Sequence, residues 1–164
     1  MRLFVALFGG MIVIDQLVKL WARNSFAERQ SSEFPWPGVF EFTLTYNKGI
    51  AFGMLQGFGI YLAPIAIAIA GGAFWYVTRH KHESVWMHVS LGLIASGAVG
   101  NLIDRIWLGK VTDMFSFRLI NFPVFNVADS CITVGAILLV LIGLLESFRK
   151  PQKDSLDEPV DAHE

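Results

Sequence analysis

Four long segments of this sequence are almost free of charged side chains, and they constrain the fold more than any other feature. They cover residues 3–22, 58–78, 84–103 and 127–148. A helix needs about 20 apolar residues to cross the hydrocarbon core of a bilayer, and each segment is about that long. Only 16% of the 164 residues are charged, where about 25% is typical of a soluble domain. We therefore predict a single membrane domain over residues 1–150 with four transmembrane helices.

The connections between these segments predict a small sheet on one side of the membrane. The long loops, residues 23–57 and 104–126, each join an odd-numbered helix to an even-numbered one, so both emerge at the same face. Residues 39–46 alternate between apolar and polar side chains, which is the period of a strand. A turn at 47–49 would lead into a second strand at about 50–54. The predicted fold class is a membrane all-α protein with a small β element.

Charge patterning predicts the orientation and the ends of the chain. Residues 151–164 contain five acidic side chains, two prolines and almost no apolar residue, so we predict a disordered tail. Lysines and arginines on the side of the amino terminus lie close to the helix ends, and such residues favour the cytoplasmic side. Both termini are therefore expected in the cytoplasm, with the two long loops outside it.

Polar residues gather at the membrane face that carries the long loops. They are Asp15, Lys19, Asn47, Asn101, Asp104, Arg105, Asp113, Asn126 and Asp129. Ionisable residues in or beside a span are costly and are functional candidates. Asp113 and Asp129 flank one connection between antiparallel neighbours, so their carboxylates can meet. Two close carboxylates share a proton; the ionised one can activate water while the other polarises a carbonyl, as in aspartic peptide hydrolysis.

The same residues also have purely structural interpretations. Asn126 can cap the fourth helix, with Asp129 three residues later completing a capping box. Asp113 fits an ordinary turn aspartate that bonds its own backbone. Asp15 and Lys19, four residues apart, fit an intrahelical ion pair. The capping interpretation is compatible with catalysis, because a cap can also hold a catalytic group.

Arg105 also has a structural interpretation, as a residue at a helix end whose guanidinium group extends to the membrane interface.

Several other kinds of site are excluded or disfavoured. A single cysteine, Cys131, excludes an intrachain disulfide and a cysteine zinc cluster. The zinc protease signature H-E-x-x-H is absent. With a net charge of −1, the chain has no electrostatic footprint for nucleic acid.

Five blocks, in order and with matching spacing, resemble one known family. They are DQLVK at 15–19, YNKGIAF at 46–52, GAVGNLIDR at 97–105, GKVTD at 109–113 and FNVADS at 125–130. This pattern resembles lipoprotein signal peptidase, also called signal peptidase II, over about residues 1–150. One position departs from it, since Ile50 stands where the family usually has a smaller residue.

The resemblance implies an aspartic endopeptidase of the bacterial inner membrane with four helices and an extracytoplasmic sheet cradle. Its substrate would be a prolipoprotein with diacylglycerol on its lipobox cysteine, cut just before that cysteine. By motif position, Asp113 and Asp129 would be the catalytic dyad and Asp15 a supporting residue. The residues that would line the substrate site are Asn47, Asn101, Arg105 and Asn126. The expectation extends to a monomer in membrane lipid that is inhibited by globomycin and uses no metal or cofactor.

Two other classes of function compete with the peptidase. A proton-coupled four-helix transporter would use Asp15, Asp113 and Asp129 as carriers. Transporter sites usually lie near the midplane between internal repeats, and this sequence shows neither feature. A structural membrane subunit would use the same acids only for pairing, so that loss of a carboxylate would impair folding and not turnover.

Overall fold

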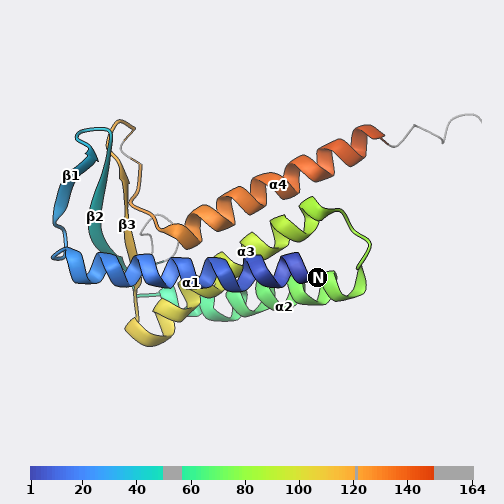
Figure 1. The fold of residues 1–164 in the computed structure, drawn as a ribbon. Helices are drawn as coiled ribbons and strands as arrows, with labels where there is room; N and C mark the ends of the chain where they lie inside the picture. The colour runs from blue at the N-terminus through green and yellow to red at the C-terminus, as the bar shows by residue number, and fades with distance from the viewer. Residues whose placement is uncertain (50–56, 121, 150–164) are drawn as a thin grey trace, which may run out of the picture.

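The computed structural model describes residues 1–49, 57–120 and 122–149. Within these residues lie four long helices, α1 (Arg2–Ser25), α2 (Ala63–Arg79), α3 (Val85–Leu108) and α4 (Val127–Arg149), with a short 3-10 turn, η2 (Gly59–Leu62), before α2 (Figure 1). All four, with α2 taken together with η2 as Gly59–Arg79, are long and apolar enough to cross a membrane. The prediction of a four-helix membrane domain with a small β element is confirmed. The predicted strand at 50–54, Ile50 and the tail at 151–164 lie outside the described residues.

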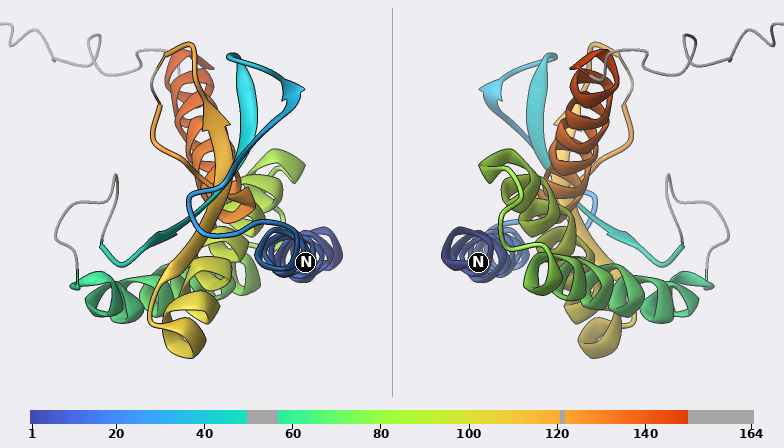
Figure 2. Two further views of the ribbon diagram at one scale, coloured as in Figure 1. Left: turned by 90° about the vertical axis from the view of Figure 1, so that its left-hand side faces the viewer. Right: turned by 90° about the vertical axis from the view of Figure 1, so that its right-hand side faces the viewer.

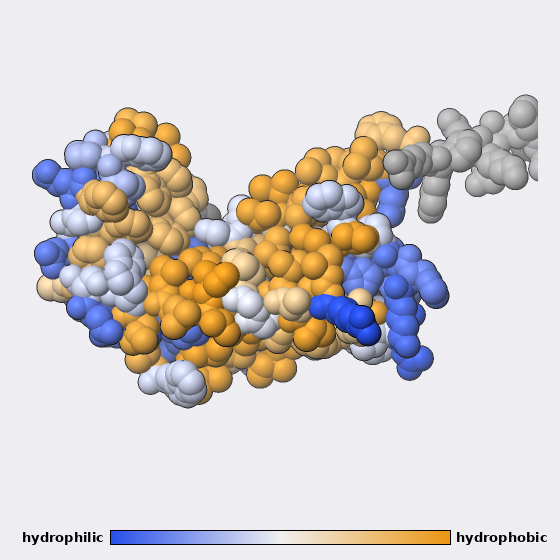
Figure 3. All heavy atoms as spheres, viewed as in Figure 1, coloured by the Kyte–Doolittle hydropathy of each residue, from blue (hydrophilic) through white to orange (hydrophobic). Residues whose placement is uncertain are grey.

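Helix α3 is the centre of the bundle. It contacts each of the other three helices, and Figure 2 shows α1, α2 and α4 arranged around it. Within its apolar stretch 56% of the residues are buried, against 11–17% for the other three helices. The outer helices therefore present their apolar side chains to the surroundings. Figure 3 shows these side chains as a continuous apolar band between two more polar ends, as expected for a chain solvated by lipid.

Three antiparallel strands form the predicted sheet, and two of them come from unexpected places. The strands are β1 (Ser31–Trp36), β2 (Phe40–Asn47) and β3 (Val111–Phe117), in the order β1-β2-β3. The alternation at 39–46 thus identified the central strand. Its described partners are the segment before it and the connection between α3 and α4. Strand β1 was missed because it has no alternation and contains Pro35, a residue that disfavours strands.

The apolar face of the sheet packs on the end of α1. Leu44 and Met114 form a buried cluster with Ala22 of α1. The ring of Phe42 meets Trp21 edge-on, with the ring centroids 5.2 Å apart. These contacts hold the sheet against the bundle at the end away from the amino terminus (Figure 1). That end also holds the last turns of α1 and α3 and the first turn of α4.

A polar clasp built on Glu41 ties the three strands together. Its Oε1 accepts a hydrogen bond from the Gly38 N–H (2.9 Å), and its Oε2 accepts from Ser31 Oγ (2.8 Å) and Arg118 Nε (2.7 Å). These hydrogen bonds, that from Gly38 above all, lower the pKa of Glu41 to about 2. The carboxylate therefore stabilises the folded sheet at neutral pH.

Glu41→Gln is expected to lower the melting temperature of the purified protein at neutral pH, because the amide cannot accept all of these hydrogen bonds. Since the pKa is lower in the folded state, the stabilisation is present above the ordinary value of 4.5 and is lost as the pH falls towards about 2. The difference in melting temperature between variant and wild type should shrink over that range. A constant difference from neutral to acidic pH would contradict this role for the Glu41 carboxylate.

Candidate active site

The amino-terminal end of α4 is closed by a reciprocal capping box. The Asp129 N–H donates to Asn126 Oδ1 (2.9 Å), and the Asn126 N–H donates to Asp129 Oδ2 (3.2 Å). The capping interpretation of these two residues is therefore correct. It also has a consequence for the site, because the box fixes the Asp129 carboxylate in the first turn of α4, where the helix dipole favours a negative charge.

Asp113 reaches the same place from strand β3. Its backbone pairs with Thr45 of β2, and its carboxyl Oδ1 accepts a hydrogen bond of 2.6 Å from Asn126 Nδ2. Asp113 and Asp129 thus share Asn126 as a hydrogen-bond partner. Burial of Asp113 (3% exposed) and, secondly, the charge of Asp129 raise its pKa to about 8. A carboxyl group with that pKa is protonated at neutral pH.

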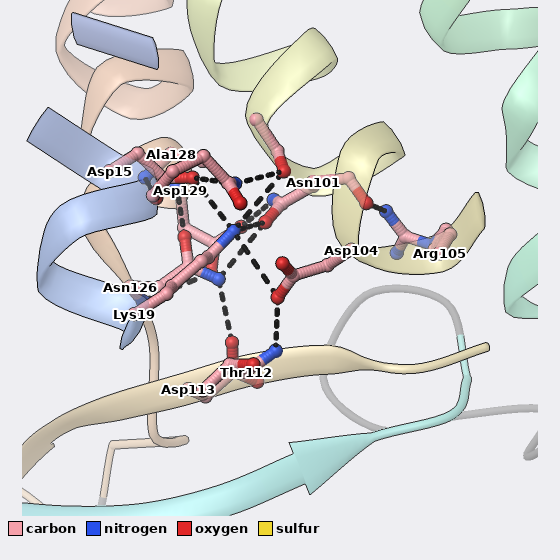
Figure 4. Close-up of polar contacts among 12 residues, drawn as sticks. Asp15, Lys19, Asn101, Asp104, Arg105, Thr112, Asp113, Asn126, Ala128 and Asp129 are labelled. Carbon is pink, nitrogen blue, oxygen red and sulfur yellow. Dashed lines mark hydrogen bonds and ion pairs between the residues drawn. The ribbon is translucent and has the colours of Figure 1, made fainter. Parts of the chain in front are cut away.

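Asn101 of α3 connects the two aspartates to a buried lysine. Its Nδ2 donates to Asp129 Oδ1 (2.7 Å), while its Oδ1 accepts from Asn126 Nδ2 (3.0 Å) and from Lys19 Nζ (3.0 Å). Figure 4 shows these side chains converging from α1, α3, β3 and the start of α4. The predicted meeting of the polar residues at one end of the bundle is therefore observed.

A layer of buried charges lies behind the two aspartates. The Lys19 ammonium is fully buried and forms an ion pair with Asp15 Oδ2 (2.9 Å) and a longer one with Asp104 Oδ2 (3.7 Å). Asp15 also uses its Oδ1 to accept from the Ala128 N–H (2.9 Å). The intrahelical ion pair expected of Asp15 and Lys19 exists, and through Asp15 it is connected to the first turn of α4. Buried charges must be paired in this way, because an unpaired one is strongly destabilising.

Asp104 and Lys19 are the residues whose part in the site the sequence did not reveal. Asp104 Oδ2 accepts from the Thr112 N–H (2.8 Å), which fixes the backbone next to Asp113. Both residues had been counted among the polar residues of this membrane face, but without a role in the site. The sequence contains no signal for these roles, because both side chains lie near helix ends and only the structure shows that they are almost fully buried.

The two aspartates open onto a pocket of about 930 Å³. Its polar lining consists mainly of Asp113, Asp129, Asn101, Asn47 and Arg105. Its other walls are apolar and include Ile65, Ile69, Ile132, Val134 and Phe125. They belong to α2, α4 and the end of the β3–α4 connection. The pocket can therefore hold an apolar ligand beside a pair of acids.

The remaining predicted site residues take two different positions. Asn47 lines the pocket, and its Oδ1 accepts from the Gly49 N–H (2.8 Å). Arg105 also lines it, held by a 3.4 Å hydrogen bond from Nη1 to the Asn101 carbonyl. Its buried Nε has no hydrogen-bond partner within the described part of the chain. Asn126 and Asp15, in contrast, are buried behind the lining, where they position the aspartates.

The described ranges 1–49, 57–120 and 122–149 contain no group of three or more His, Cys, Asp or Glu side chains placed to hold a metal ion. A raised carboxyl pKa next to a second carboxylate is the arrangement of a general acid–base pair.

Comparison with known proteins gives consistent matches over most of the chain. Residues 7–145 match the family model described as signal peptidase (SPase) II. The chain is 41% identical over 132 residues to a lipoprotein signal peptidase of Streptococcus thermophilus, covering 80% of this chain and 86% of that protein. It is 39% identical over 140 residues to one of Streptococcus pyogenes, covering 85% and 91%.

Two solved structures share the fold. Both are described as bacterial membrane enzyme structures obtained by the in meso method. One aligns with a TM-score of 0.84 at 28% identity, the other with 0.76 at 29%, and each covers 93% of this chain and 94% of its own. The similarity therefore includes the helices and the sheet together.

Proposed function

This chain belongs to the signal peptidase II family, and we propose that it removes signal peptides from prolipoproteins by aspartic catalysis. The observation that carries the proposal is the placement of Asp113 and Asp129, which share Asn126 and face one pocket. The pKa of Asp113 at about 8 supports a pair that holds one proton near neutral pH. Such a pair contains a base and an acid at once.

The reaction follows from these two protonation states. The ionised carboxylate takes a proton from a water molecule, whose oxygen attacks the scissile carbonyl carbon, while the other carboxyl group donates its proton to the carbonyl oxygen. The tetrahedral intermediate, a gem-diol, collapses when the first carboxyl group passes its proton to the leaving amine and one hydroxyl of the gem-diol returns a proton to the second carboxylate. The carbon–nitrogen bond breaks, and the pair returns to its starting state with one proton.

The lining of the pocket supports a lipid-modified substrate. Ile65 and Ile69 of α2 face the cavity together with Ile132 and Val134 of α4, and these walls suit acyl chains or an apolar signal peptide. A prolipoprotein with diacylglycerol on its cysteine presents both next to the bond that is cut. We propose cleavage on the amino-terminal side of that cysteine, with the acids at the sheet end of the bundle meeting the bond near the membrane interface.

The topology and the inhibitor follow the same proposal. The chain has four helices long enough to span a membrane and is a multi-pass membrane protein of a bacterial family. We propose that both termini are cytoplasmic and that the sheet and the pocket lie on the opposite side. We propose that globomycin, the inhibitor that the family resemblance implies, binds in the pocket. We also propose that the enzyme is a monomer.

Arg105→Ala is expected to lower turnover by about 100-fold, the loss typical of one donor that stabilises developing charge. Its guanidinium lines the pocket beside the aspartates and has an unpartnered Nε within the described residues, so it can donate to the substrate backbone. The measurement is steady-state cleavage of prolipoprotein by purified protein. The control is Arg79→Ala, which removes an exposed guanidinium from the last turn of α2, outside the pocket. Normal turnover of Arg105→Ala would reduce Arg105 to an interfacial anchor.

The proposed function is tested against the proton-coupled transporter in one reconstituted system. Purified protein in lipid vesicles is supplied with a diacylglyceryl-modified prolipoprotein, and both cleavage and proton flux are recorded. We expect cleavage without proton flux, because the acids lie at one end of the bundle and not at its midplane. Proton flux that depends on Asp113, in protein that does not cleave, would overturn the proposal.

A further inference from the structure

Two obligate donors fix the direction of every hydrogen bond around the aspartate pair. An ammonium group and a backbone N–H can only donate. The amide atom of Asn101 that faces Lys19 Nζ at 3.0 Å must therefore be its oxygen. The other amide atom is then the nitrogen, and it donates to Asp129 Oδ1 at 2.7 Å. The Lys19 ammonium group therefore determines which atom of the Asn101 amide is the oxygen and which is the nitrogen, two atoms that are otherwise hard to tell apart.

The same argument fixes Asn126. The atom that faces the Asp129 N–H at 2.9 Å must be its oxygen. Its nitrogen then has two hydrogens, which are donated to Asn101 Oδ1 (3.0 Å) and to Asp113 Oδ1 (2.6 Å). Neither amide can rotate without bringing two donors, or two acceptors, face to face. The buried lysine and the capping box therefore lock the polarity of the network.

With these orientations, the two aspartate carboxyl groups accept different numbers of hydrogen bonds. Asp129 receives a donor at each oxygen, Asn101 Nδ2 at Oδ1 and the Asn126 N–H at Oδ2. Asp113 receives one, at Oδ1, and within the described residues no donor faces its Oδ2. Donors stabilise the charged form of a carboxyl group, and an oxygen without a donor is where a proton can reside.

The strongest charge at Asp113 and the helix dipole act in the same sense. Asp113 faces the negative charge of Asp129 on α4 and, more weakly, the positive charge of Lys19 on α1 and the negative charge of Asp104 on α3. Asp129 faces Lys19 and, more weakly, Asp15, both on α1. Arg105 on α3 faces both members of the pair. Asp129 lies in addition in the first turn of α4, where the helix dipole stabilises an anion, whereas Asp113 lies on a strand that offers no such field.

The geometry points to a fixed division of roles: Asp113 carries the shared proton on Oδ2 and is the acid, while Asp129 is the ionised base that activates water. The inference rests on the proposed aspartic function and assigns each step of it to one residue. Asp113 Oδ2–H donates to the scissile carbonyl oxygen as the water oxygen bonds to the carbonyl carbon, and Asp129 receives the proton of that water. Lys19, which acts through Asn101, is a positioning residue for this arrangement.

The assignment predicts opposite behaviour for two matched variants. Asn at position 113 reproduces a protonated aspartate, with an oxygen that accepts from Asn126 Nδ2 and an NH2 group in place of the Oδ2 hydroxyl. Asn at position 129 instead places its NH2 group against one of two donors, Asn101 Nδ2 or the Asn126 N–H. Asp113→Asn should therefore melt at or above the temperature of the wild type, and Asp129→Asn should melt below it.

Infrared spectroscopy of the same proteins in detergent identifies the proton directly. The spectra are compared at about pH 6, between the ordinary value of 3.8 and the pKa of about 8 for Asp113. The wild type should show a protonated-carboxyl band that Asp113→Asn lacks. Asp129→Asn should keep the band, because burial still raises the pKa of Asp113. A band that persists in Asp113→Asn and is lost in Asp129→Asn, or the reverse order of melting, would overturn the assignment.

The cleavage assay separates this inference from the proposed function. Both variants are expected to be inactive if the pair is catalytic, whichever residue holds the proton. Cleavage retained by both would contradict the catalytic pair itself. Inactive variants with exchanged infrared and melting behaviour would contradict only the assignment of acid and base.

Discussion

Replacing either Asp113 or Asp129 with Asn is expected to lower the rate of prolipoprotein cleavage by at least about 100-fold, the lower end of what a positioned acid or base contributes. Each substitution keeps the size of the side chain and removes the titratable group. The pair shares Asn126 and one pocket, so neither partner can complete the proton transfers alone. The double variant should therefore be little worse than either single variant.

The control for this pair is Glu41→Gln, which makes the same change from acid to amide within the sheet but outside the pocket. It should retain turnover at a temperature where the protein is folded. Retention of more than about one tenth of wild-type cleavage by Asp129→Asn would correspond to less than about 1.4 kcal/mol of transition-state stabilisation. That is too little for an essential base, and it would contradict the catalytic pair.

Gly97→Ala is expected to disrupt the contact between α3 and α4 and thereby abolish activity. A Cβ atom at this position would overlap the carbonyl oxygen of Ala128 and lie 2.7 Å from Cγ1 of Ile132. The obstacle is backbone, so α4 must shift as a whole. Asp129, the next residue after Ala128, would then leave its hydrogen bond from Asn101. Overpacking of this kind typically costs about 1–3 kcal/mol.

The measurement is thermal unfolding of the purified variant in detergent together with cleavage. Gly72→Ala is the matched control, because Gly72 lies in α2 and a Cβ there would have no neighbour within 4 Å. Removing a helical glycine at an open position should stabilise slightly, by about 0.5–1 kcal/mol. A Gly97→Ala protein that melts and cleaves like the wild type would show that the α3–α4 contact adapts, against the present account.

The membrane architecture and the location of the candidate site were predictable because each segment long enough to span the bilayer must run in the direction opposite to the previous one. A helix that crosses the bilayer must deliver its ends to opposite faces, so the order of apolar segments alone brings Asp15, Asn101 and Asp129 to one end. The alternation around Phe42 and Leu44 likewise identified β2. The first inference needs only the number of apolar residues in each segment, and the second needs only the alternation of apolar and polar residues. Neither depends on contacts between side chains.

Side-chain partnerships were not predictable in the same way. The ion pair between Lys19 and Asp15 follows from their spacing, but the contacts of Lys19 with α3 do not, because they depend on the close approach of α1 to α3 at Gly100. Asn126, placed by motif among residues that line the substrate site, is instead fully buried between the two aspartates. Strand β1 is held by pairing with β2 and by the hydrogen bond between Ser31 and Glu41. These contacts join different segments of the chain, so the local sequence of β1 does not reveal them.

The central claim is that the pocket cuts a lipid-modified prolipoprotein beside its cysteine. The most direct measurement is cleavage by the purified wild-type protein of a prolipoprotein with diacylglycerol on that cysteine, compared with the same chain without the lipid, with products identified by mass spectrometry. The account predicts release of the signal peptide and a new amino terminus at the modified cysteine, with little cleavage of the unmodified chain. Equal cleavage of both chains, a cut at another bond, or no cleavage of the modified chain would contradict it.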